Sequence, residues 1–143
     1  VIYNPLANHI LEYVKRNDIK KIKKKDYLLC IGSLKKPNAF HYAIEGFAGI
    51  IDKFPNLRLK IVGKGNLEKE LKHITKNFGI ARHVDFEGFQ KNIIPYYLYA
   101  RATVLTSLYE GFPNVLIESI ALGTPVVSFV CPCGPCGILS VGV

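Results

Sequence analysis

Short apolar runs alternate with amphipathic segments along most of this chain. We expect strands at residues 27–31, 57–62, 84–87, 102–105 and 126–130. Apolar side chains recur at helical spacing between them, which predicts helices at residues 39–54, 67–78, 93–100 and 113–122. Strands that alternate with helices form β-α-β units, so the pattern predicts an α/β fold with a parallel sheet and right-handed crossovers.

The faces of the predicted strands suggest their order in the sheet. Runs 27–31, 102–105 and 126–130 are apolar on both faces, as interior parallel strands are, whereas 57–62 and 84–87 alternate and suit positions toward an edge. This predicts a Rossmann-like order 3-2-1-4-5 with helices on both faces and a ligand at the carboxyl ends of the strands. Ser33, Gly63, Gly88 and Glu110 follow those ends, so we expect them to line one site.

The bulk composition indicates a single globular domain. The chain has 143 residues, of which 49% are hydrophobic and 21% charged. No apolar run reaches the roughly 20 residues of a membrane span, and Val1 opens no secretory signal, so we expect a cytoplasmic protein. We assign residues 1–26 to an interdomain linker or crossing segment and 27–143 to the folded domain.

The net charge of +8 is concentrated before the first predicted strand. The segment contains Lys15, Arg16, Lys20, Lys21, Lys23, Lys24 and Lys25. It suits a solvated linker, or else attraction to a membrane surface or to an anionic lipid-linked substrate. Binding of nucleic acid is disfavoured, because no aromatic residues are interleaved with these lysines.

The cysteines leave several interpretations open. Cys131, Cys133 and Cys136 stand at spacings that suit thiolate ligands, but a structural zinc site needs four ligands. The fourth would be Cys30, within a predicted buried strand, or a histidine. A disulfide is an alternative. Reduced cysteines in a turn require nothing further, and we predict no metal site.

The segment from Glu110 to Glu118 carries the strongest functional signal. It places two carboxylates with seven residues between them, the first on a loop and the second inside a helix, and Gly111, Phe112 and Pro113 form the turn that opens the helix. Backbone N–H groups at such a helix start attract anions, while carboxylates hold neutral hydroxyls. The arrangement suits a sugar attached to a phosphate. Taken singly, Glu118 also suits a solvated helix carboxylate and Glu110 an ordinary loop acid.

From residue 27 to 130 the sequence resembles the carboxyl-terminal half of glycosyl-transferase group 1 enzymes, which are retaining, metal-independent transferases of the two-domain GT-B fold. The motifs that carry the resemblance are LLCIGSL, LKIVGKGNLEKEL, VDFEGF and TSLYEGFPNVLIESIALGTPVVS. The last one contains the family's Glu-x7-Glu pattern. Residues 1–5 are similar to the family's interdomain crossing segment.

The resemblance implies a role for each matching position. Glu110 would face the hydroxyls of the donor sugar, the backbone of residues 111–114 would contact sugar and diphosphate, and Glu118 would hold the ribose hydroxyls. The loop 88–91 would lie against the base, and 63–65 would turn tightly near the nucleotide. The implied donor-binding residues are Ser33, Gly63, Gly65, Gly88, Phe89, Gly111, Phe112, Pro113, Asn114, Val115 and Glu118.

The sequence also departs from the family pattern. The family has an arginine after the first-strand glycine and a lysine five residues later, where this chain has Ser33 and Asn38. Those two cations neutralise the diphosphate leaving group, and each lost charge-assisted contact costs about 1.5–3 kcal/mol. Lys35 or Lys36 is the candidate substitute. The family's Gly-Pro-Arg-Glu is Gly134-Pro135-Cys136-Gly137 here, so we expect an incomplete carboxyl end, and the acceptor-binding half lies outside this sequence.

We therefore expect the donor-binding part of a retaining glycosyltransferase, with Glu110 and Lys36 as catalytic residues. It would use a nucleotide diphosphate sugar, most often a UDP-sugar in this family, and no cofactor. The acceptor would be a glycan or a polyprenyl-linked sugar at the inner face of the membrane, in surface polysaccharide synthesis. Activity would need a separately encoded acceptor domain. The alternative is a non-catalytic remnant that binds a nucleotide or a partner protein.

Overall fold

The computed structural model describes residues 5–19, 22–35, 39–106, 114–128 and 139–141. The strands are β1 (Tyr27–Ile31), β2 (Arg58–Val62), β3 (Val84–Gly88), β4 (Ala102–Leu105), β5 (Val126–Ser128) and β6 (Leu139–Val141). The helices are α1 (Pro5–Arg16), α2 (Phe40–Ile50), α3 (Glu68–Asn77), α4 (Ile94–Tyr99) and α5 (Asn114–Ala121), with a short 3-10 turn η3 (Ala81–His83).

The sheet has the order β3-β2-β1-β4-β5-β6, in which β1 to β5 are parallel and β6 runs antiparallel to β5. The predicted order 3-2-1-4-5 is confirmed, including the interior place of β1. Strand β6 was not expected from the sequence. Of the strand predicted at 126–130, the last two residues lie outside the described part of the chain.

Polar and apolar residues alternate in β2 and β3 because their charged residues form pairs near the β3 edge of the sheet. Arg58 donates two hydrogen bonds to the Asp85 carboxylate, at 2.7 and 2.8 Å, and Lys60 lies 3.4 Å from both Asp85 and Glu87. The hydrogen bonds from Arg58 are the main cause that lowers the pKa of Asp85. Polar residues on these strands therefore pair with one another, while their neighbours face the core.

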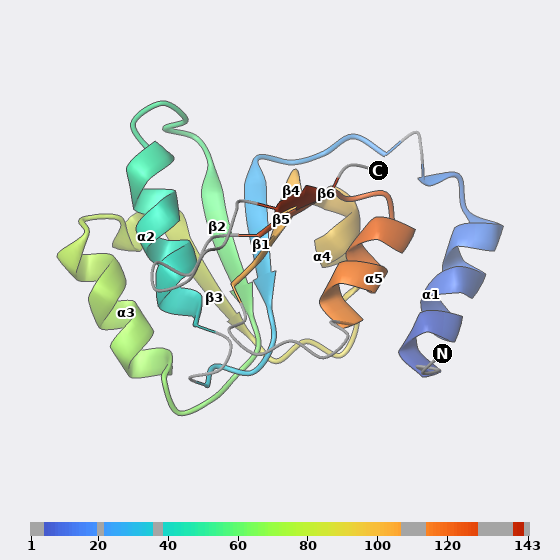
Figure 1. Ribbon diagram of the computed structural model, residues 1–143, viewed down its shortest axis with the longest axis horizontal. Coiled ribbons are helices and arrows are strands. Elements are labelled where there is room, and N and C mark those ends of the chain that lie inside the picture. The colour runs from blue at the N-terminus through green and yellow to red at the C-terminus, as the bar shows by residue number, and fades with distance from the viewer. Residues whose placement is uncertain (1–4, 20–21, 36–38, 107–113, 129–138, 142–143) are drawn as a thin grey trace.

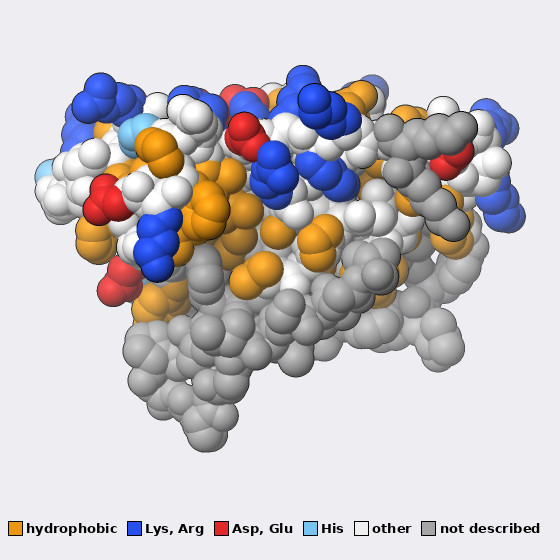
Figure 2. All heavy atoms as spheres, turned by 90° about the horizontal axis from the view of Figure 1, so that it is seen from above, with side chains coloured by type: hydrophobic (Ala, Val, Ile, Leu, Met, Phe, Trp, Pro, Cys, Tyr) orange, Lys and Arg blue, Asp and Glu red, His pale blue; other side chains and the backbone are white. Residues whose placement is uncertain are grey.

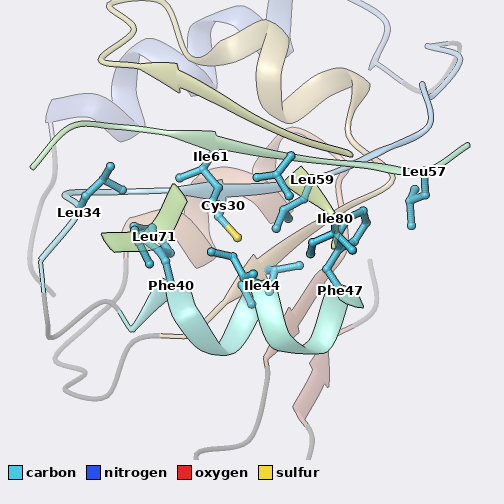
Figure 3. Packing of buried hydrophobic residues seen from close by; sticks show 13 residues of the cluster. Cys30, Leu34, Phe40, Ile44, Phe47, Leu57, Leu59, Ile61, Leu71 and Ile80 are labelled. Atoms are coloured by element: carbon cyan, nitrogen blue, oxygen red, sulfur yellow. The ribbon is translucent and has the colours of Figure 1, made fainter. Parts of the chain in front are cut away.

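Helices α2 and α3 cover one face of the sheet, and α4 and α5 cover the other, with α1 beyond α5 (Figure 1). On the first face, Phe40, Ile44 and Phe47 of α2 point toward the side chains of β1 and β2 (Figure 3). Cys30 lies in the middle of this cluster as a fully buried free thiol, and burial raises its pKa to about 12. The helical spacing read from the sequence is the spacing of these buried contacts.

The second face buries part of the segment that precedes β1. Ile10 of α1 is only 2% exposed and belongs to the same cluster as Leu29, Tyr97 and Leu122, and α1 contacts α5. Lys24 is half-buried and bonded to protein oxygens, so the interpretation of the basic segment as wholly solvated is wrong at this residue. Ile10 and Lys24 therefore attach described parts of this segment to the domain.

Backbone contacts join the loops that follow the first three strands. Gly63 donates a hydrogen bond to the carbonyl of Gly88 at 2.7 Å, and Leu34 donates one to Lys64 at 3.0 Å. Gly63 has a φ of +139°, and a Cβ there would lie 1.8 Å from the carbonyl oxygen of Gly32. A Cβ at Gly65 would lie 2.4 Å from the oxygen of Leu34. Only glycine permits backbones to approach this closely.

We predict that Gly63→Ala lowers the free energy of unfolding by roughly 2 kcal/mol or more, because the methyl group meets rigid backbone and the φ angle disfavours alanine. The matched control is Gly49→Ala, at an exposed site of α2 where no atom lies within 4 Å of the added Cβ. That change should stabilise by about 0.5–1 kcal/mol through helix propensity. Urea unfolding of both variants measures the difference, and equal effects would contradict the close approach.

Candidate functional site

A pocket of about 820 Å³ lies at the carboxyl ends of β1 and β2, where the sequence predicts a site. The loops after these strands form one side, the loop after β3 forms another, and α4 and α5 close it. Its lining residues are Ile31, Gly32, Ser33, Lys35, Val62, Gly63, Lys64, Gly65, Phe89, Gln90, Ile93, Tyr97, Val115 and Glu118. The lining combines an apolar surface with two lysines and one carboxylate.

Glu118 is the most unusual residue of this pocket. It lies on α5, it is only 4% exposed, and the hydroxyl of Tyr97 donates a hydrogen bond to its Oε1 at 2.9 Å. Its Oε2 is buried and accepts no hydrogen bond from the described residues. A buried carboxylate oxygen without a donor is costly, since ionised groups need partners away from water. The interpretation of Glu118 as a solvated helix carboxylate is therefore excluded.

Burial and the tyrosine act on Glu118 in opposite directions. Burial raises the pKa of the Glu118 carboxyl, and the hydrogen bond from Tyr97 offsets part of that rise. Burial is also the main cause that raises the pKa of Tyr97, so its hydroxyl keeps its proton and remains a donor. A second donor at the free oxygen would stabilise the ionised carboxylate further. The Glu118 carboxylate can therefore accept a hydrogen bond from a hydroxyl group of a ligand.

Buried hydroxyl groups hold α4, α5 and β4 together beneath this pair. Ser119 donates to the carbonyl of Thr124 at 2.8 Å and accepts from the hydroxyl of Thr103 at 2.7 Å. The hydroxyl of Thr124 donates in turn to the carbonyl of Tyr97. All three side chains are almost fully buried, so these bonds replace the water that the hydroxyls lose. The network fixes the helices that carry Tyr97 and Glu118.

Phe89 marks the rim of the pocket after β3. Its ring is 68% exposed, which is unusual for a phenylalanine, and the ammonium of Lys64 lies 5.8 Å from the ring centre. Lys35 stands on the loop after β1 and also lines the pocket. An exposed aromatic ring beside a lysine offers a stacking surface and a positive charge.

The structure brings together part of the predicted site. Ser33, Gly63, Gly65, Phe89, Val115 and Glu118 line the pocket. Gly88 does not line it but supports the Gly63 loop through its carbonyl, and Asn114, the first residue of α5, is exposed outside the lining. The predicted residues Lys36, Glu110, Gly111, Phe112 and Pro113 lie outside the described part of the chain, as do Cys131, Cys133 and Cys136.

Tyr97 is the site residue that sequence reasoning missed. It belongs to the tyrosine-rich helix α4, in which Tyr96 and Tyr99 are only half-buried. The helical spacing places Tyr97 and Leu98 on the buried side, and a buried tyrosine needs an acceptor for its hydroxyl. Glu118 needed a donor for the same reason. These two requirements are the signal that the sequence contains, but they do not by themselves identify the two residues as partners.

A second hollow of about 600 Å³ lies at the opposite end of the strands, where β1, β2 and β4 begin. It includes Leu28, Phe54, Pro55 and Leu57 together with the ion pair of Asp26 and Arg101. Figure 2 looks onto this end of the strands, where Lys and Arg side chains are interspersed with hydrophobic ones.

Across residues 5–19, 22–35, 39–106, 114–128 and 139–141, no His, Cys, Asp or Glu groups are placed to hold a metal ion. No helix in these residues is long and apolar enough to span a membrane.

We predict that Glu118→Gln changes how stability depends on pH. Because the folded state raises the pKa of Glu118, this residue weakens the wild-type fold as pH rises from below its ordinary pKa of 4.5 through its raised value. Glutamine has no such dependence, so the unfolding free energy of the variant relative to wild type should increase as the pH is raised from below 4.5 into the neutral range. Urea unfolding across this range measures it. Glu45→Gln, at an exposed site of α2, is the matched control, and a difference for Glu118→Gln that stays constant with pH would contradict the assignment.

Comparisons with known proteins show the family of this chain. The family model described as "Glycosyl transferases group 1" matches residues 13–143. An uncharacterized glycosyltransferase of Methanocaldococcus jannaschii is 33% identical over 94% of this chain and 32% of its own length. The N-acetylgalactosamine-N,N'-diacetylbacillosaminyl-diphospho-undecaprenol 4-alpha-N-acetylgalactosaminyltransferase of Campylobacter jejuni is 31% identical over 89% of this chain and 33% of its own length.

Solved structures share the fold. TarM of S. aureus superposes with a TM-score of 0.73 at 22% identity, covering 80% of this chain and 24% of that one. The carboxyl-terminal domain of a group 1 glycosyl transferase, LpcC, from Francisella tularensis gives a TM-score of 0.66 at 26% identity, over 76% of this chain and 60% of that one. The chain spans about a third of the curated relatives that it matches. With the family model covering nearly its whole length, this chain belongs to the glycosyl transferases group 1 family.

Proposed function

We propose that this chain binds a nucleoside diphosphate sugar and forms the donor-binding part of a retaining glycosyltransferase. The transferase would pass the sugar to a glycan or lipid-linked acceptor in surface polysaccharide synthesis. The observation that carries the proposal is Glu118, which lines the main pocket and whose buried Oε2 accepts no hydrogen bond from the described residues. The proposal rests on the fit between this oxygen and a ribose hydroxyl.

A ribose supplies what the Glu118 carboxylate lacks. Its neighbouring hydroxyls are neutral donors, and one of them can reach Oε2 while Tyr97 continues to donate to Oε1. A hydrogen bond to a charged group contributes about 1.5–3 kcal/mol, and more where water is excluded. An anionic group would be repelled at this point, so the phosphates of the ligand must lie elsewhere in the pocket.

The glycine loops and lysines suit the diphosphate. Gly63 and Gly65 let the loops after β1 and β2 pack backbone against backbone beside the pocket, and Lys35 and Lys64 supply positive charge on these two adjoining loops. Ser33, at the position where the family has arginine, is exposed in this lining. We therefore propose Lys35 as one substitute cation, alongside Lys36 and the sugar-facing Glu110 as catalytic residues. The exposed ring of Phe89 would face the base.

The relatives inform the proposed substrates. The Campylobacter jejuni relative is named for transfer to a diphospho-undecaprenol-linked acceptor, and the description of the TarM structure includes UDP. We extend these to a UDP-sugar and a polyprenyl-linked acceptor here. Because the chain spans about a third of its relatives, the acceptor-binding half would come from a further polypeptide segment. The net charge of +8 suits peripheral contact with an anionic membrane surface on the cytoplasmic side.

A second candidate function is a remnant that binds nucleotide or a partner but does not catalyse. The observation in its favour is the replacement of both phosphate-binding cations of the family, by Ser33 and Asn38. Weak leaving-group stabilisation would reduce turnover while the Glu118 contact still held a nucleotide. Supplying an acceptor-binding half from a relative and following the release of UDP from a UDP-sugar separates the two functions.

We predict saturable binding of one nucleoside diphosphate in calorimetric titrations with UDP, GDP and ADP. Glu118→Gln should weaken that binding by roughly 10-fold or more, because the amide is a poorer acceptor than the carboxylate. Glu45→Gln, which changes an exposed acid on α2, should bind like wild type. Absence of binding by the folded wild-type chain, or equal affinity in Glu118→Gln, would overturn the proposal.

A further inference from the structure

Lys24 is half-buried and makes contacts that are unusual for a lysine of a basic segment. It belongs to the basic stretch before β1, yet its ammonium donates to the carbonyl of Leu98 at 2.7 Å and to the hydroxyl of Thr124 at 2.8 Å. Burial lowers its pKa. An ammonium that gives up water must recover the loss through specific acceptors, and here both acceptors come from distant parts of the chain. The position is therefore specified by the fold rather than by solvation.

The two acceptors stand where the site helices end. Leu98 lies in the last turn of α4, and Thr124 follows the end of α5. Carbonyl groups at a helix end lack partners within the helix and favour a positive charge. One ammonium thus joins the carboxyl-terminal ends of both helices.

The same ends are connected to the Tyr97–Glu118 pair. The Thr124 hydroxyl, which accepts from Lys24, donates to the carbonyl of Tyr97. Ser119, adjacent to Glu118, donates to the carbonyl of Thr124. The side-chain hydroxyl of Tyr97 donates a hydrogen bond to Glu118. Lys24 is therefore linked to the carboxylate by the hydrogen bond to Thr124, by the bond from Thr124 to the backbone of Tyr97, and by the side chain of Tyr97 itself.

We propose that Lys24 is a positioning residue of the donor site, which sets the relative placement of α4 and α5 and so aims the Glu118 carboxylate. The nucleotide part of this inference rests on the proposed function. Without Lys24, the ends of both helices lose their shared partner, and the Tyr97 hydroxyl no longer meets Oε1 in one fixed geometry. Since a hydrogen bond weakens steeply with misalignment, small shifts of the helices matter.

The first experiment needs no ligand. We would follow the carboxyl carbon of Glu118 by NMR against pH in wild type, Lys24→Met, Thr124→Val and Lys23→Met. Among the described residues, the titratable groups that contact Glu118 or line the same pocket are Tyr97 on α4, Lys35 and Lys64. Loss of the aligned Tyr97 donor should raise the midpoint by roughly half a unit or more in both Lys24→Met and Thr124→Val. Lys23→Met, at an exposed neighbouring lysine, should leave it unchanged.

Thr124→Val separates positioning from direct electrostatics, because it alters the network without altering charge. A midpoint that rises in Lys24→Met alone would show a charge effect and overturn the inference. A midpoint that is unchanged in Lys24→Met would also overturn it. If Lys24→Met does not fold, Lys24→Gln and Thr124→Val test the same link, and an unchanged midpoint in folded Lys24→Gln has the same meaning.

The second experiment compares UDP with its dideoxy analogue, which lacks both ribose hydroxyls. Wild type should prefer UDP by about 10-fold, and the preference should fall at least about 3-fold in Lys24→Met while Lys23→Met keeps it. General destabilisation would weaken both ligands equally and leave the ratio intact, which would overturn the inference. Failure of wild type to bind either nucleotide would overturn the proposed function, and the ligand-free titration would still decide the role of Lys24.

Discussion

Gly63 lies so close to the carbonyl oxygen of Gly32 that one added methyl group would overlap it. This approach lets the loops after β1, β2 and β3 bond to one another through backbone atoms, with Gly63 donating to Gly88 and Leu34 to Lys64. The loops then leave a hollow rather than filling it with their own side chains. The positive charge and the exposed ring that the pocket offers to a ligand depend on this contact, because Lys35, Lys64 and Phe89 all stand on the loops that it joins.

Glu118 adds a second constraint of opposite character. The pocket loops contact one another through backbone atoms, whereas α5 places the ionisable side chain of Glu118 in the interior. Among the described residues, only Oε1 of this side chain accepts a hydrogen bond. The surrounding fold compensates with a dense set of buried hydroxyl contacts among Thr103, Ser119 and Thr124. The unpartnered Oε2 lowers the stability of the fold, and the hydrogen bonds around it offset that loss. Such local conflict with the rules of a well-packed core is typical of binding sites.

Much of the fold could be predicted from periodicity. The run at 27–31 is apolar on both faces because β1 lies inside the sheet, and the alternation at 57–62 reflects the charged pairs that β2 makes with β3. Glu118 and the glycine loops were identified because their residue types are unusual in context. Tyr97, Lys24 and β6 were missed, since their partners lie 21 to 100 residues away or in a strand that reverses direction. Local pattern does not encode such pairings.

The central place of β1 has a consequence for how the chain acquires its structure during synthesis. Residues up to Gly88 already contain β1, β2 and β3 with both connecting helices, so this half of the sheet can assemble as soon as it leaves the ribosome. The other side of β1 must wait for β4, whose Ala102 pairs with Leu28. Contacts between residues so far apart in sequence form later than local ones. We therefore expect the glycine loops after β1 and β2 to form before α5 is synthesised and buries Glu118.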